Sequence, residues 1–274
     1  MRTSGIDDQE KNQANQTQGG ERGSDHSHSR GKLWVVGIGP GDLEQMSLKA
    51  YNVLKEAEVI VGYKTYIKLV EDLIEGKEIV NSGMTKEVDR SLFALERAYA
   101  GKKVAVISSG DAGIYGMAGI VLELLLKKGW QDELKVEVVP GITSSQGAAA
   151  SLGAPLMHDF VTISLSDLLT PWELIEKRLN LAAQGDFIIT LYNPMSKKRR
   201  EQIKIAQEIF LKYKSPKTPV GIVRNAKRAG EEVTITDLES FLEHPIDMFT
   251  MIIVGNSETF TKEDFMITPR GYKV

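Results

Sequence analysis

The amino-acid sequence predicts an α/β protein with two α/β domains, the first built mainly on a parallel sheet and the second on a mixed sheet. From Lys32 onward, short apolar segments alternate with amphipathic helical segments, which is typical of consecutive βαβ units. Apolar segments that lack a polar face are expected when helices cover both sides of a parallel sheet. The length of 274 residues suits two domains of ordinary size.

The expected organisation is a tail followed by these two domains. Residues 1–31 are rich in Gln, Asn, Gly, Ser and Asp and contain a single Ile, so they are predicted to form a disordered N-terminal tail. The first domain is expected over residues 32–147 and the second over residues 148–274. The boundary is placed there because the regular βαβ rhythm loosens after the Ala-rich segment 143–152.

Capping residues mark the helices of the first half. Ser47 and Thr85 are expected N-caps, and Gly101 and Gly129 are expected to end the helices that precede them. Strands are expected at residues 33–36, 59–61, 78–80, 104–108 and 135–139, and helices at residues 47–56, 65–74, 87–100, 116–128 and 143–152.

The second half has a looser pattern. One helix is expected to open at Thr170, with Pro171 at its first position and Glu173 completing a capping box. A second helix is expected over residues 198–213. Strands are expected near residues 160–165, 187–192, 220–224, 233–236 and 248–254. Two strands that follow each other between residues 220 and 236 without a helix indicate a mixed sheet.

Composition excludes several classes of function. The net charge is −3 and the pI is about 5.9, so we expect no nucleic-acid partner and no membrane surface as partner. The chain has no Cys, so no protein-bound iron–sulfur cluster is expected. His26 and His28 are more typical of solvated tail residues than of a metal site, and no protein-bound metal is expected. A cytoplasmic protein is the default expectation, since no apolar run reaches the roughly 20 residues of a transmembrane helix.

Three small-residue loops follow three predicted strands, at residues 37–42, 108–116 and 140–145. Ligands of open α/β sheets bind beyond the carboxyl ends of the strands. Small residues there let backbone groups approach a ligand without side chains between them. The three loops together therefore predict a binding rim.

The first loop resembles a dinucleotide fingerprint only in part. Asp42 stands where a G-x-G-x-x-G motif needs glycine, and Pro40 removes a backbone donor. A carboxylate there would repel a pyrophosphate. A nucleotide-binding oxidoreductase or a ligand-sensing module is thus the less favoured alternative, which the fold alone does not exclude.

The same loops resemble the motifs of the tetrapyrrole methylases, which use S-adenosylmethionine (SAM). Longer second-half motifs are similar to those of one branch of the cobalamin pathway, precorrin-3B C(17)-methyltransferase. They include Gly153-Ala154-Pro155-Leu156-Met157-His158-Asp159-Phe160, Leu191-Tyr192-Asn193-Pro194, Val254-Gly255-Asn256-Ser257 and Thr268-Pro269-Arg270-Gly271-Tyr272. The resemblance covers the chain from about Lys32 to its end.

The resemblance implies a homodimer that methylates a precorrin-3 type tetrapyrrole at C-17 with ring contraction, leaving S-adenosyl-L-homocysteine as product. Another tetrapyrrole or precorrin methylase is the alternative, and whether the substrate carries cobalt is open. The fold is expected to be the two-domain tetrapyrrole methylase fold, with SAM between the domains. The residues implied in SAM binding are Gly39, Pro40, Ser109, Gly110, Asp111, Ile114, Thr143, Ser144, Tyr192 and Asn193.

Ring contraction moves protons, so a general acid or base is expected near the cleft. The leading candidates are His158 and Asp159, adjacent in sequence; a His packed at a hinge and an Asp capping a turn are equally consistent with the pattern. Asp42 is expected to face the substrate, and Tyr63 is a further catalytic candidate.

A tetrapyrrole carries many carboxylates, which favours cationic neighbours. The expected substrate contacts are Tyr115, Arg224 and Lys86, with Arg228, Lys197, Lys198 and Arg199 as further cationic candidates.

Overall fold

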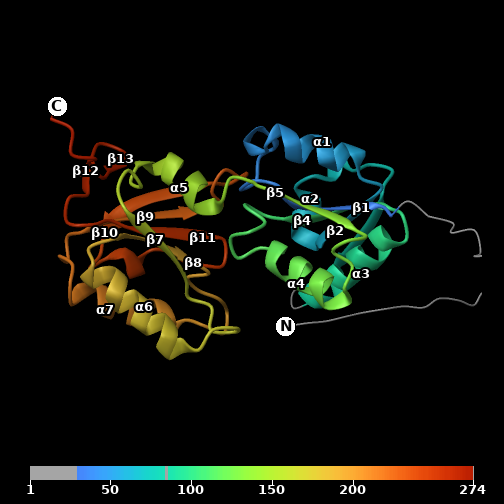
Figure 1. The fold of residues 1–274 in the computed structure, drawn as a ribbon. Coiled ribbons are helices and arrows are strands. Elements are labelled where there is room, and N and C mark those ends of the chain that lie inside the picture. Colours follow the sequence, from blue (N-terminus) through green and yellow to red (C-terminus); the bar gives the residue numbers. More distant parts are fainter. Residues whose placement is uncertain (1–29, 84–85, 274) are drawn as a thin grey trace, which may run out of the picture.

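The computed structural model describes residues 30–83 and 86–273, and within these residues the chain forms two five-stranded sheets and one three-stranded sheet (Figure 1). The predicted disordered tail lies almost entirely outside the described residues. Helices and strands alternate through the first half as predicted, and the α/β fold class is confirmed. None of the helices in the described part of the chain is long and apolar enough to cross a membrane.

The first sheet is parallel throughout, with strand order β3-β2-β4-β1-β5. Gly37 at the end of β1 lies opposite Ser108 of β4, and Val36 lies opposite Val139 of β5. The carboxyl ends of these three neighbouring strands therefore meet at one edge. The strands are β1 (Lys32–Gly37), β2 (Val59–Tyr63), β3 (Glu78–Ser82), β4 (Lys103–Ser108) and β5 (Lys135–Val139).

Helices cover both faces of the first sheet. Alternate residues of β1 point to opposite sides: Trp34 packs on the side of α1 (Leu48–Glu56), and Leu33 packs on the side of α3 (Glu87–Tyr99) and α4 (Ala118–Lys128). Both side chains are fully buried. This double burial explains why the strands are apolar throughout.

The second sheet is mixed, with strand order β10-β9-β11-β8-β7. β7 pairs parallel with β8, whereas β11 pairs antiparallel with both β8 and β9. The prediction of a mixed sheet is confirmed. Its strands are β7 (Phe160–Ser164), β8 (Ile188–Tyr192), β9 (Pro219–Arg224), β10 (Glu232–Asp237) and β11 (Thr250–Val254), and the small third sheet holds β6 (Gly153–Ala154), β12 (Phe260–Lys262) and β13 (Phe265–Ile267).

Helices also cover both faces of the second sheet (Figure 1). α6 (Trp172–Gln184) and α7 (Glu201–Leu211) pack on one face, and α5 (Ser144–Leu152) packs on the other with Ala148 and Leu152 against Val223 of β9. α5 thus links the last strand of the first sheet to the core of the second. The domain boundary between residues 147 and 148 stays a prediction.

Several local expectations need correction. The helix expected over residues 65–74 is divided into α2 (Lys64–Lys68) and a 3-10 turn (Glu71–Leu73). Pro171 is the N-cap residue of α6 rather than its first helical residue, and no side chain bonds to that helix end. Thr85, the expected cap of α3, lies outside the described residues. By contrast, Ser47 is the N-cap of α1, and its hydroxyl accepts a hydrogen bond from Ala50 N at 3.1 Å.

Candidate functional site

The loops that follow β1, β4 and β5 pack against one another through their backbones. We call these loops, at residues 37–42, 108–116 and 140–145, the first wall. The backbones of Gly39 and Gly110 pair by two hydrogen bonds of 3.1 and 2.8 Å. A Cβ on Gly141 would lie 2.3 Å from the carbonyl oxygen of Gly110 and 2.7 Å from Gly37. Only glycine permits such a close approach, so the predicted rim is a packed unit.

A carboxylate ties two of these loops together. Asp111 Oδ1 accepts a hydrogen bond from Gly113 N at 2.7 Å, and Oδ2 accepts one from Gly141 N at 2.9 Å. The side chain of Asp111 therefore has the role of a brace within the first wall. Because both carboxylate oxygens are engaged, its predicted contact with the cofactor would come from its backbone atoms.

Opposite the first wall lies a second wall formed by residues at the strand ends of the second sheet. They are Tyr192 at the end of β8 and Asn193 after it, Asn225, Ala226 and Arg228 after β9, and residues 248–251 at the start of β11. The Tyr192 hydroxyl makes a short hydrogen bond with Thr143 Oγ1 and accepts one from Ser145 N at 3.2 Å. The two walls are therefore joined at the start of α5.

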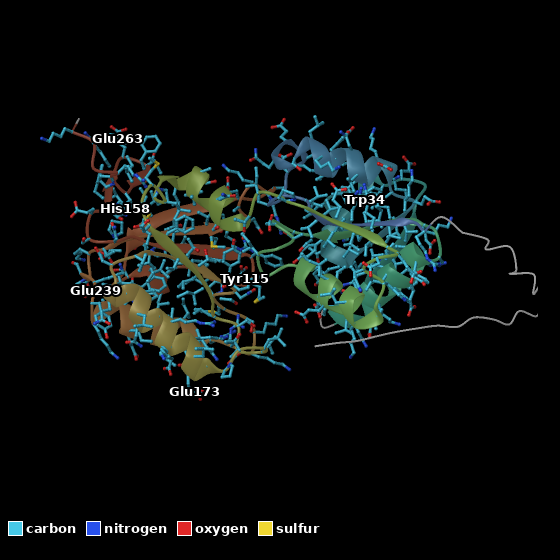
Figure 2. The ribbon with its side chains drawn as sticks, in the orientation of Figure 1. Trp34, Tyr115, His158, Glu173, Glu239 and Glu263 are labelled. Atoms are coloured by element: carbon cyan, nitrogen blue, oxygen red, sulfur yellow. The ribbon has the colours of Figure 1, made fainter. Side chains whose placement is uncertain are left out.

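Tyr115 extends from the first wall to the second. Its ring lies 5.2 Å from the ring of Tyr192, measured between centroids, and its hydroxyl donates to the carbonyl oxygen of Thr162 at 3.3 Å. Figure 2 shows Tyr115 in the region where the two halves of the chain meet. Tyr115 thus closes one side of the space between the walls.

Left-handed backbone conformations gather at this place. Tyr115, Asn193 and Asn225 have φ values of 52°, 50° and 52°. Residues other than glycine adopt such values at an energetic cost, and they concentrate at functional sites. Asn193 is fixed on two sides, because its Nδ2 donates to Ser164 Oγ at 3.0 Å and its carbonyl oxygen accepts from the Arg199 guanidinium.

A cavity of about 240 Å³ lies between the two walls. Polar and apolar side chains of both sheets surround it. Eight residues predicted for the site line this cavity: Pro40, Tyr63, Ser109, Ile114, Tyr115, Ser144, Tyr192 and Asn193. Gly39, Gly110, Asp111 and Thr143 belong to the first wall without lining the cavity, through the contacts described above.

Three other predicted residues lie outside the cavity. Asp42 is exposed, and its carboxylate accepts a hydrogen bond from Glu44 N at 3.2 Å, which caps a 3-10 turn. Asp42 therefore does not line the cavity, and its expected place on the substrate side stays a prediction. Lys86 is exposed and lies 3.3 Å from Asp89. Arg224 is paired with Asp247 at 3.0 Å and with Glu232 at 3.3 Å.

His158 and Asp159 precede β7 and so lie at its amino end, whereas Ser164 at its carboxyl end faces the second wall. Figure 2 shows His158 well apart from Tyr115, on the side of the molecule that carries the C-terminus. The imidazole Nδ1 accepts a hydrogen bond from Asp159 N at 2.8 Å, and both side chains are exposed. Their position gives no support to a role at the cavity. The alternative is not matched either, because His158 is exposed rather than packed and its imidazole, not the Asp159 carboxylate, accepts the backbone N–H of this turn.

Further residues also line the cavity. Arg228, one of the cationic candidates for substrate contact, lines it, as do Tyr66, Asn225 and Phe249, which are not predicted for the site. The rule that ligands bind beyond strand ends, applied to β9, would have pointed to Asn225. Nothing in the sequence indicated that the loop before β11 returns to this cavity.

Burial sets the charge state of the cavity. It raises the pKa of the Tyr66 and Tyr115 phenols, so both are neutral hydrogen-bond donors at neutral pH. It also lowers the pKa of the Arg228 guanidinium, whose ordinary value is so high that the group stays charged. Within the described residues, no group of three or more acidic or His side chains is placed to hold a metal. The site can therefore bind a small organic molecule through backbone groups, phenols and one cation.

The sequence comparisons identify relatives along almost the whole chain. The family model of Tetrapyrrole (Corrin/Porphyrin) Methylases matches residues 32–242. "Cobalt-factor III methyltransferase" of Priestia megaterium is 54% identical over 246 residues, which are 89% of this chain and 46% of that protein. This chain thus spans about half the length of that relative. "Probable cobalt-factor III C(17)-methyltransferase" of Salmonella typhimurium is 49% identical over 240 residues, covering 88% of this chain and 99% of that protein.

Solved structures agree with this grouping. The crystal structure of the methyltransferase CobJ matches with a TM-score of 0.83 and 36% identity, covering 87% of this chain and all of that one. Uroporphyrin-III C-methyltransferase from Thermus thermophilus, complexed with S-adenosyl homocysteine, matches with a TM-score of 0.64 and 27% identity over 82% of this chain and 97% of that one. The chain therefore belongs to the tetrapyrrole (corrin/porphyrin) methylase family.

Proposed function

We propose that this chain transfers a methyl group from SAM to C-17 of a precorrin-3 type tetrapyrrole, with ring contraction, in cobalamin biosynthesis. The observation that carries the proposal is the 49% identity to the Salmonella relative along 99% of that protein's length. The cavity supports it, since it lies at the carboxyl ends of the strands, where α/β sheets bind ligands.

The first wall fits the donor. Gly37 and Gly141 leave no room for a Cβ, so the three loops pack closely together. Pro40, Ser109 and Ser144 of these loops line the cavity. SAM, when bound, supplies an activated methyl group. Pro40, Ser109 and Ser144 would hold it in place, and the walls would keep water from the reacting carbon. Catalysis would then depend on orientation in a site from which water is excluded.

A cobalt-containing substrate is the more favoured form. The Priestia and Salmonella relatives both carry cobalt-factor III in their names. The cobalt would arrive with the substrate rather than reside in the protein. Precorrin-3B, which lacks the metal, is the second candidate.

Among the catalytic candidates, Tyr63 has the best placement. Tyr63 lines the cavity with its ring edge-on to Tyr66, at 5.3 Å between centroids. We infer that one of these two phenols serves as the proton donor during contraction. Asp42, His158 and Asp159 have no comparable access to the cavity.

A direct assay tests the proposal. The protein is incubated with SAM labelled in its methyl group and with either cobalt-factor III or precorrin-3B, and the product is examined by mass spectrometry and carbon NMR. A gain of one labelled methyl group at C-17 is expected with the cobalt form. Labelling at another ring position would instead identify a different precorrin methylase.

The nucleotide-binding oxidoreductase alternative has a simple thermal test. S-adenosylhomocysteine is expected to raise Tm in a concentration-dependent way, and NAD is expected to leave it unchanged. Stabilisation by NAD alone would reverse the assignment.

We also propose that the protein is a cytoplasmic homodimer. Light scattering on the purified protein measures its mass in solution, and fractionation of cells measures its location. A monomer at all concentrations, or recovery with membranes, would contradict these two points.

A further inference from the structure

Arg228 places a positive charge at the second wall, and none of the acidic residues that the structure describes pairs with it. It is half-buried and lines the cavity, and no carboxylate within the described residues lies within ion-pair distance of its guanidinium. Nε donates to the carbonyl oxygen of Pro40, and Nη2 donates to Ser109 Oγ at 2.6 Å. The remaining nitrogen, Nη1, makes no hydrogen bond to any residue that the structure describes.

Other cations of the second half do not share this situation. The Lys214 ammonium is buried but pairs with Asp186 at 3.2 Å. Arg224, four residues before Arg228, pairs with two carboxylates. Arg199 is buried and forms no ion pair with any residue of the described chain, but it does not line the cavity, and it donates to the carbonyl oxygen of Asn193. Only Arg228 thus combines an unpaired charge with access to the cavity, among these four.

The chain is built to hold Arg228 in this position. A Cβ on Gly41 would lie 2.1 Å from Arg228 Cγ, so the glycine of the first loop makes room for the arginine side chain. Lys227, directly before it, has a φ of 56° and its carbonyl oxygen accepts from Asp42 N at 2.9 Å. Two backbone features therefore direct the guanidinium toward the space between the walls.

We propose that Arg228 binds a carboxylate of the ligand that occupies the cavity. This inference rests on the proposed function, in which both the amino-acid part of SAM and the side chains of the tetrapyrrole supply carboxylates. Guanidinium groups bind carboxylates through parallel hydrogen bonds, and they do so best where water is partly excluded. Burial of an unpaired cation is costly, and a carboxylate from the ligand offsets that cost.

A purely structural brace would not need the charge. Pro40 O and Ser109 Oγ are neutral acceptors, and a neutral amide could donate to either of them. The charge is explained only when an anion joins the site. A structural brace and a carboxylate-binding residue therefore predict different effects on the binding of ligands with and without a carboxylate.

The test uses Arg228→Gln, with Arg97→Gln as the matched control. Arg97 is exposed, paired with Glu78 at 2.6 Å and remote from the cavity. Calorimetry measures the Kd of S-adenosylhomocysteine and of 5′-methylthioadenosine, which lacks the carboxylate. Steady-state kinetics measures KM and kcat for the tetrapyrrole.

Two results would support the proposal and identify the source of the carboxylate. If Arg228 binds the donor, Arg228→Gln raises the Kd of S-adenosylhomocysteine by about 10- to 100-fold and leaves the Kd of methylthioadenosine unchanged. If it binds the tetrapyrrole, both nucleoside Kd values stay unchanged and KM for the tetrapyrrole rises by a similar factor. Arg228→Lys, which keeps the charge, should recover part of the loss in either case.

Three results would overturn it. The first is that both Kd values and KM for the tetrapyrrole stay unchanged in Arg228→Gln. The second is that the Kd values of both nucleosides rise by the same factor. The third is that Arg228→Lys is as impaired as Arg228→Gln. If Arg228→Gln does not fold, Gly41→Ala displaces the same side chain while keeping its charge, and the same comparison of ligands applies. A wild-type protein that neither binds S-adenosylhomocysteine nor methylates would instead refute the proposed function.

Discussion

The two walls of the cavity are held in different ways. The first wall is a backbone structure in which Gly37, Gly110 and Gly141 touch, with Asp111 bonded across it. The second wall consists of side chains held by hydrogen bonds, such as those of the Tyr192 hydroxyl and the Arg228 guanidinium. Close backbone contact leaves no freedom for repacking, whereas side-chain contacts can be removed one at a time. Substitutions should therefore damage the first wall more severely than the second.

Gly141→Ala should have the largest effect. The new Cβ would meet backbone atoms of Gly110 and Gly37 at 2.3 and 2.7 Å, and neither can move without breaking the sheet edge. We expect the free energy of unfolding to fall by about 3 kcal/mol in urea denaturation. Gly119→Ala in α4 is the control, because nothing lies within 4 Å of its Cβ position. If Gly141→Ala leaves the free energy of unfolding unchanged, the first wall is not rigid.

Asp111→Asn should come next. An amide group can accept from only one of Gly113 N and Gly141 N, and its NH₂ would then face the other donor. The expected loss is about 2 kcal/mol of unfolding free energy, with weaker binding of S-adenosylhomocysteine. Asp264→Asn, on an exposed turn, should change neither quantity. Equal stability of the two variants would show that the carboxylate does not brace the loops.

Tyr192→Phe should have a smaller effect, about 1 kcal/mol, because it removes a hydroxyl from the joint between the walls. A double-mutant cycle with Thr143→Val measures the coupling between the two side chains. Tyr213→Phe, whose hydroxyl has one long exposed contact at 3.4 Å, is the matched control. Strict additivity in the cycle would mean that the two walls are not joined here.

The smallest effect is expected from Asp247→Asn, and it should depend on pH. Burial raises the pKa of the Asp247 carboxyl, but hydrogen bonds from Arg224, Phe249 N and Thr250 outweigh it and hold the pKa below its usual value. The carboxylate thus contributes stability above its unfolded pKa of about 3.9, and this contribution disappears as the pH falls through the lower folded pKa.

The Asp247 side chain is 41% exposed, so solvent screening should limit the difference from wild type to well under about 1 kcal/mol at pH 7. Urea denaturation at several pH values measures it. The difference should be constant from about pH 5 to 7 and shrink below about pH 4. A difference that grows in acid would mean that the sign of the pKa shift is wrong.

The first wall was predictable from the sequence, and the second wall mostly was not. Glycines and small residues after consecutive strands indicate close backbone packing, and the parallel order brings the loops after β4, β1 and β5 together. Tyr192 is indicated by its place at the end of a predicted strand, whereas Asn193 is implied only by the family resemblance. The proximity of Phe249 and Arg228 to Pro40 depends on contacts over about 200 residues of chain, which no local pattern encodes.

The candidates that lie outside the cavity also show that a local sequence pattern does not indicate where a side chain lies in space. His158 and Asp159 are adjacent and chemically suitable for proton transfer, yet they lie at the amino end of β7. Arg224 ends a strand beside the cavity, but Asp247 and Glu232 already neutralise its charge. Residue type indicates what a side chain can do. Its partners in space decide whether it is available.

By itself, the sequence determined the alternation of strands and helices, the mixed character of the second sheet and the glycine loops at the first sheet edge. These follow from periodicity, capping and the absence of Cβ atoms, which are local properties of the chain. Only the tertiary structure decided that Arg228 reaches the first loop, that Gly41 makes room for it, and that the Asp111 carboxylate is already engaged. Those contacts join residues distant in sequence, and their energies depend on burial and on the partners that folding brings together.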